Sequence, residues 1–158
     1  MTFGVFMIDL LKKIHLFENL TERELEKILP LCLKQTFAKG AVIFKDGEPG
    51  DRCYILLSGA VRISKFIPNI GEEALAVLKP GDYFGEMALI DSSPRSANAI
   101  ANDDTDVFAI NQADLEKLLI EDRELGYKLF WTFTKTLSKR LRETNEKLAS
   151  FLAMSGGF

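Results

Sequence analysis

The chain has 158 residues, which suits one domain, and 47% of them are hydrophobic, enough for a sizeable core. Its formal net charge is −3, and basic residues form no broad cluster before the C-terminal region, so nucleic acid is not an expected partner. The single histidine, His15, excludes a histidine-rich metal centre and a Ser-His or Cys-His catalytic pair. We therefore do not expect an enzyme.

The N-terminal stretch MTFGVFMIDLLKKI is apolar, but it lacks a basic leader and a cleavage-site pattern, and its uncharged run is too short to span a bilayer. Cys32 and Cys53 are isolated from each other and are expected to be reduced thiols. These features predict a soluble, cytoplasmic protein with no membrane contact.

Residues 1–30 are predicted to form N-terminal helices. Apolar side chains at helical spacing indicate a first helix over residues 5–17: Phe6, Leu10, Ile14 and Phe17. A second helix follows, because Thr21 and Glu24 have the spacing of a capping box, and Pro30 ends it.

Residues 31–111 change to a strand-like pattern. Short apolar segments alternate with turns that contain glycine: LKQTFA, AVIF, YILLS, AVRISKF, EALAVL, ANAIA and DVFAI. Strands this short and this regularly spaced are typical of a small jelly roll. We expect a mainly β fold with flanking helices, in which an eight-stranded jelly-roll β-barrel lies between N-terminal helices and a long C-terminal helix.

Residues 112–158 are predicted to be a hinge and a long helix that serves as a lid and a dimerisation element. Asn111 is a plausible cap for the first helix, and the long helix runs from about residue 122 to 152. Its first half is expected to pack on the chain's own barrel. Its second half has an a/d seam, which favours a partner helix: Leu137, Leu141, Thr144, Leu148 and Phe151.

The segment 84–101, FGEMALIDSSPRSANAIA, carries the most specific chemistry. A glycine that leads into one helical turn exposes backbone N–H groups to an anion, and Arg95 adds a forked cationic donor for phosphate. Glu86 is suited to a ligand that presents a hydroxyl beside its phosphate, as a cyclic ribose phosphate does. The alternative is that Glu86 and Arg95 only pair on the surface or cap a turn, since exposed ion pairs are common.

The same segment resembles the phosphate-binding cassette (residues 84–97) of the cyclic nucleotide-binding domain family, and Gly47, Gly50, Gly59 and Gly81 resemble its turn glycines. The resemblance covers about residues 8–152. It implies that Glu86 binds the ribose 2′-hydroxyl and that Arg95 binds the phosphate. The backbone of Gly85, Glu86, Met87 and Ala88, with Ser96 and Ala97, would complete the phosphate cradle.

The segment KRLRETNEKL resembles the long helix of the catabolite activator branch of that family. This implies that Thr144 and Asn145 contact the base, one from each subunit of a homodimer. The printed sequence ends at AMSGGF without a helix-turn-helix, so no specific DNA binding is expected and the chain is either a stand-alone sensor or a fragment.

We therefore expect a regulatory domain that binds cyclic AMP, with cyclic GMP possible, needs no cofactor or metal, and signals to an unknown effector protein through its C-terminal helix. The alternative is a dimeric structural or interaction module with a vestigial pocket.

Overall fold

The computed structural model describes residues 3–156, apart from the side chains of Phe3, Val5, Ala88 and Leu89. The helical elements are α1 (Phe3–Lys12), η1 (His15–Phe17), α2 (Glu22–Ile28), η2 (Leu29–Leu31), α3 (Met87–Asp91), α4 (Gln112–Glu121) and α5 (Arg123–Met154). The strands are β1 (Leu33–Phe37), β2 (Val42–Phe44), β3 (Arg52–Ser58), β4 (Val61–Ile67), β5 (Gly71–Leu78), β6 (Tyr83–Phe84), β7 (Asn98–Ala101) and β8 (Thr105–Asn111).

The N-terminal helices depart from the prediction of a single helix over residues 5–17. Helix α1 ends at Lys12, Ile14 is extended, and the short helix η1 follows. The break allows Ile14, Leu16 and Phe17 all to enter the core, although a continuous helix would point positions 14 and 16 in nearly opposite directions. Phe6, predicted on the apolar face, is instead 62% exposed. The capping box of α2 is confirmed, because Thr21 and Glu24 bond each other's backbone N–H.

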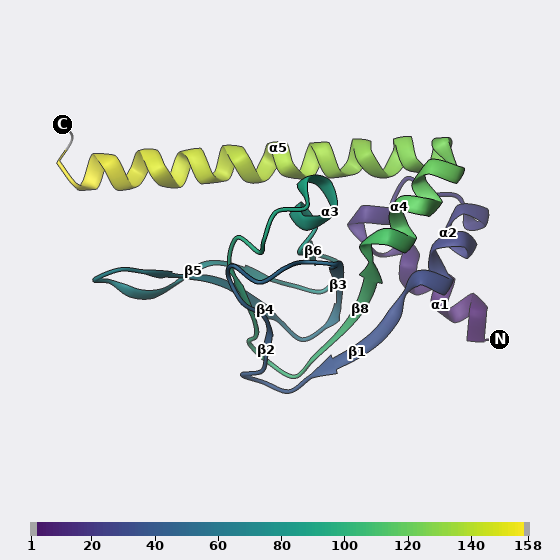
Figure 1. Ribbon diagram of the computed structural model, residues 1–158, viewed down its shortest axis with the longest axis horizontal. Helices are drawn as coiled ribbons and strands as arrows, with labels where there is room; N and C mark the ends of the chain where they lie inside the picture. The colour runs from purple at the N-terminus through teal and green to yellow at the C-terminus, as the bar shows by residue number, and fades with distance from the viewer. Residues whose placement is uncertain (1–2, 157–158) are drawn as a thin grey trace.

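The eight strands form two four-stranded antiparallel sheets, in the orders β1-β8-β3-β6 and β2-β7-β4-β5 (Figure 1). This confirms the predicted jelly roll with flanking helices. Seven strands fall on the segments predicted to be strands. Strand β6 was not among them, because two residues are too few to show an alternating pattern.

The core consists of two clusters that share strand β3. Ile55 points to the helices and packs in a cluster with Leu25, Leu125 and Phe133, whereas Leu56 points into the β-roll. Successive strand residues face opposite sides, so one strand serves both clusters. Cys53 lies in the first cluster, and burial raises the pKa of its thiol to about 12.

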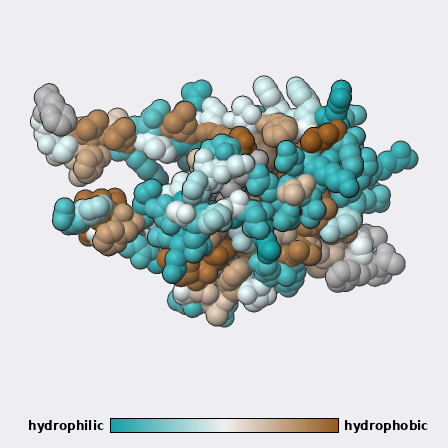
Figure 2. Space-filling view, in the orientation of Figure 1, coloured by the Kyte–Doolittle hydropathy of each residue, from teal (hydrophilic) through white to brown (hydrophobic). Residues whose placement is uncertain are grey.

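Helix α5 runs above the β-roll and continues above its β4–β5 hairpin (Figure 1). Its first half packs on the core through Leu125, Leu129 and Phe133, as predicted. Beyond Arg140 its residues are exposed, and hydrophobic side chains gather along this free end (Figure 2). Within residues 3–156, no helix combines the length and the apolarity that crossing a bilayer requires.

Candidate functional site

The segment between β6 and β7 forms a tight loop around helix α3. Gly85 has a φ of +74°, which favours glycine, and a Cβ atom at this position would lie 2.7 Å from Nη1 of Arg95. Helix α3 begins after Glu86 and ends at Asp91, and the next residue, Ser92, is left-handed with a φ of 55°. The predicted single turn of helix is therefore present, and Gly85 lets its backbone approach Arg95 closely.

Arg95 is buried at the base of this loop, with only 6% of its surface exposed. Its Nη1 donates to the carbonyl of Gly85 at 3.0 Å and its Nη2 to the carbonyl of Arg52 at 2.8 Å. The guanidinium lies 4.2 Å from the centroid of the Phe44 ring, a cation–π contact. Its Nε is buried without a hydrogen-bond partner among the described residues. Burial lowers the pKa of Arg95, but a guanidinium stays charged in proteins, so the site holds a fixed positive charge.

Glu86 is also buried, with 3% of its surface exposed, and it does not pair with Arg95. Its Oε1 accepts from Nη1 of Arg140 on α5 at 2.5 Å, and Nη2 of Arg140 donates to the carbonyl of Tyr83 at 2.8 Å. This arrangement rules out the alternative in which Glu86 and Arg95 form only a surface ion pair. Oε2 of Glu86 makes no hydrogen bond to the described residues.

A cavity of about 970 Å³ lies between the β-roll and α5. The predicted site residues that line it are Gly85, Glu86, Met87, Arg95, Ser96, Ala97 and Thr144. Ala88 lies in α3, but its side chain is outside the described part. Asn145 is exposed on α5 and does not line the cavity. Within one chain the structure therefore places Thr144, but not Asn145, beside the other predicted site residues.

Residues 34–122 match the family model of the cyclic nucleotide-binding domain. The chain belongs to the cyclic nucleotide-binding domain family. A CRP-like cAMP-activated global transcriptional regulator of Mycobacterium tuberculosis is 28% identical over 146 residues, which are 92% of this chain and 63% of the regulator. The chain thus spans less than two thirds of the length of that relative.

Two of the solved structures that resemble this cyclic nucleotide-binding domain show the extent of the likeness. One is a cyclic nucleotide-binding domain from Methylobacillus flagellatus, with a TM-score of 0.81 and 28% identity, covering 94% of this chain and 83% of that one. The other is the catabolite activator protein of Thermus thermophilus, with a TM-score of 0.76 and 33% identity, covering 87% of this chain and 62% of that one.

Sequence reasoning missed Arg140, which joins α5 to the loop of this cyclic nucleotide-binding domain. Arg140 and Glu86 are 54 residues apart, and no local pattern links them. One signal was available: Arg140 lies four residues before Thr144, so both are on the same face of α5. It also missed Phe44 and Arg52, which hold Arg95 through a ring and a carbonyl.

Proposed function

We propose that this domain is a regulatory sensor, not an enzyme, that binds cyclic AMP in the cavity between the β-roll and α5. Arg95 binds the phosphate, because it is a buried fixed charge whose Nε has no hydrogen-bond partner among the described residues. The backbone around α3 adds N–H donors, since the first N–H groups of a helix have no partner within it. Glu86 binds the ribose 2′-hydroxyl through Oε2.

The observation that carries this proposal is the contact of Glu86 with Arg140. Glu86, the carboxylate proposed to bind the ribose hydroxyl, is held by Arg140 of α5, the helix proposed to transmit the signal. A ligand that bonds Glu86 shares the carboxylate that holds Arg140, so ligand binding and the position of α5 are coupled. An unidentified effector protein would read that movement.

The state of the Thr144 hydroxyl favours adenine as the base. Its Oγ1 donates to the carbonyl of Arg140 at 2.9 Å, and while that bond is kept its oxygen offers a ligand an acceptor. The 6-amino group of adenine donates, whereas the 6-oxo group of guanine accepts. Cyclic AMP is therefore the proposed ligand, and cyclic GMP is the weaker alternative.

The free end of α5 supports a parallel homodimer. Leu141, Leu148 and Phe151 are 61%, 55% and 64% exposed and follow the a/d spacing. A second copy would cover this seam and bring its own Asn145 towards the base. The same exposed seam favours the second candidate function, a dimeric interaction module whose pocket is vestigial.

Calorimetry with cyclic AMP and cyclic GMP tests the proposal on the parent and on Thr144→Ala. We expect cyclic AMP to bind more tightly, by up to about 1–3 kcal/mol, and Thr144→Ala to reduce that difference. Tighter binding of cyclic GMP would contradict the choice of base. If neither nucleotide binds and neither raises the melting temperature, the interaction module is the better reading.

A further inference from the structure

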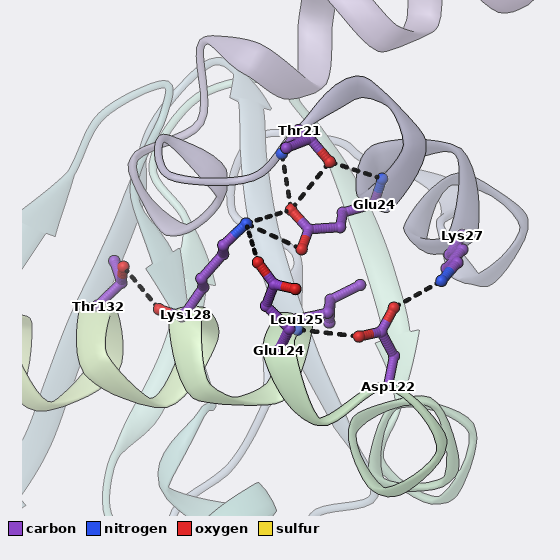
Figure 3. A network of polar contacts seen from close by, with 8 residues as sticks. All are labelled: Thr21, Glu24, Lys27, Asp122, Glu124, Leu125, Lys128 and Thr132. Carbon is purple, nitrogen blue, oxygen red and sulfur yellow. Dashed lines mark hydrogen bonds and ion pairs between the residues drawn. The ribbon is translucent and has the colours of Figure 1, made fainter.

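Each of the two walls of the cavity is held by a lysine that does not line the cavity. On the α5 side, Nζ of Lys128 bonds both carboxylate oxygens of Glu24, at 3.0 and 2.9 Å, and fixes the first turns of the helix on α2 (Figure 3). On the β-roll side, Nζ of Lys65 donates to the carbonyl of Ser96 at 3.0 Å and lies 3.4 Å from a carboxylate oxygen of Asp46. Lys65 therefore holds the backbone of the predicted phosphate-binding loop itself.

Lys65 follows the last pair of the β4–β7 ladder. The two strands pair as far as Ser64 and Asn98, so Ser96 lies beyond the end of the ladder. The side chain of Lys65, the next residue of β4, donates to the Ser96 carbonyl instead of a strand N–H. The lysine thereby extends the contact between the strands into the loop that precedes β7.

The loop between β2 and β3 holds the preceding peptide unit in the same way. The N–H of Gly47 donates to the carbonyl of Arg95 at 2.8 Å. Asp46, the neighbour of Gly47, is the residue that pairs with Lys65. The two groups that bond the carbonyls of Arg95 and Ser96 are therefore close together, on one side of the loop.

These two carbonyl contacts set the direction of two N–H groups. In a trans peptide unit, the carbonyl of one residue and the N–H of the next point in opposite directions. Gly47 and Lys65 do not line the cavity, so the two carbonyls that they bond point away from it. Ser96 and Ala97 do line the cavity, and their N–H groups therefore point towards it. Neither N–H makes a hydrogen bond to the described residues, and successive free N–H groups form an anion-binding concavity.

We propose that Lys65 is a positioning residue that holds the loop so that the N–H groups of Ser96 and Ala97 face the phosphate of a cyclic nucleotide. The inference rests on the proposed function. One exocyclic oxygen of the phosphate lies against Arg95 and the other against the N–H pair. Lys65 does not touch the ligand, because its Nζ is on the far side of the peptide unit from the cavity.

Lys65→Met tests this role, because it removes the donor and keeps a side chain of similar length. We expect it to weaken cyclic AMP binding about three- to tenfold, the scale of one hydrogen bond lost to the phosphate. Lys65→Arg still donates to the carbonyl and should bind within about twofold of the parent. The stability in urea without ligand should change little, because the Lys65 side chain is 47% exposed and exposed ion pairs contribute little.

Lys34→Met is the matched control. Lys34 pairs with Asp106 at 3.0 Å, lies on the other sheet and does not line the cavity. It should bind cyclic AMP like the parent and unfold in urea like Lys65→Met.

The two phosphorothioate diastereomers of cyclic AMP separate orientation from charge. Each has sulfur, a weak hydrogen-bond acceptor, in place of one exocyclic oxygen. The diastereomer with sulfur against the N–H pair has already lost much of that interaction, so Lys65→Met should weaken it less than the other and change the ratio of their affinities about threefold. A lysine that only attracted the negative phosphate would affect both diastereomers equally.

Three results would overturn the positioning role while the parent still binds: an unchanged affinity of Lys65→Met, an equal loss for both diastereomers, or a loss that Lys65→Arg shares. If the parent binds neither cyclic AMP nor cyclic GMP, the proposed function is wrong and the role of Lys65 fails with it.

Discussion

Replacing Gly85 by alanine displaces Arg95 without removing it. The left-handed φ of +74° costs an alanine about 1–2 kcal/mol of folding free energy. The new Cβ would lie 2.7 Å from Nη1 of Arg95, too close for both atoms to stay in place. Nη1 is the far end of a flexible side chain, so the guanidinium moves and loses its 3.0 Å bond to the Gly85 carbonyl.

A hydrogen bond to a charged group contributes about 1.5–3 kcal/mol. If the displaced guanidinium loses one such bond to the phosphate, the dissociation constant for cyclic AMP rises roughly 10- to 150-fold. Calorimetry measures this loss, and urea unfolding measures the smaller stability loss separately.

Gly40→Ala is the matched control. Gly40 has a φ of +85°, but a Cβ atom there would meet nothing within 4 Å. We expect a similar loss of stability and unchanged affinity. If Gly85→Ala bound cyclic AMP as tightly as Gly40→Ala, Arg95 would not be the phosphate ligand in the position that the structure gives it.

Four further outcomes are expected. Arg95→Ala should weaken cyclic nucleotide binding by about 2–5 kcal/mol and Glu86→Gln by about 1–3 kcal/mol, and an Arg95→Ala affinity within about threefold of the parent would show that the site is misassigned. Light scattering should report twice the 17.7 kDa chain mass, and Leu141→Glu should give monomers; a monomeric parent would contradict the α5 seam. Burial alone would raise the pKa of Glu24, but the hydrogen bonds of its carboxylate outweigh burial and lower the pKa below 4.5. The ionised carboxylate therefore stabilises the fold above about pH 4.5, and this contribution is lost as the pH falls through the lowered pKa. Glu24→Gln should therefore destabilise the fold in urea at about pH 7 by about 1–3 kcal/mol and much less at about pH 3, whereas an equal loss at both pH values would refute the ionic role. The 158 residues should bind duplex DNA without sequence preference, which a gel shift with competing sequences checks.

Local signals predicted most of the secondary structure correctly. The capping box at Thr21 and the Asn111 cap depend on atoms two or three residues apart, so the sequence displays them directly. The loop of residues 84–97 was recognisable for the same reason. The division between α1 and η1 was not predictable, because the break at Ile14 follows from which side chains the core can accept.

The sequence by itself determined the residue types of the proposed site: an arginine as the proposed ligand of an anion, a carboxylate as the proposed acceptor from a hydroxyl, and a glycine where the backbone is left-handed. Only the tertiary structure decided how they are connected. Glu86 pairs with Arg140 on α5 and Arg95 with two carbonyls, because the fold brings together groups that are 54, 43 and 10 residues apart. A buried charge must find a partner, but the sequence does not say which of many arginines or carboxylates will be within reach. Packing of α5 on the β-roll brings Arg140 within reach of Glu86, and this contact links the pocket to the helix.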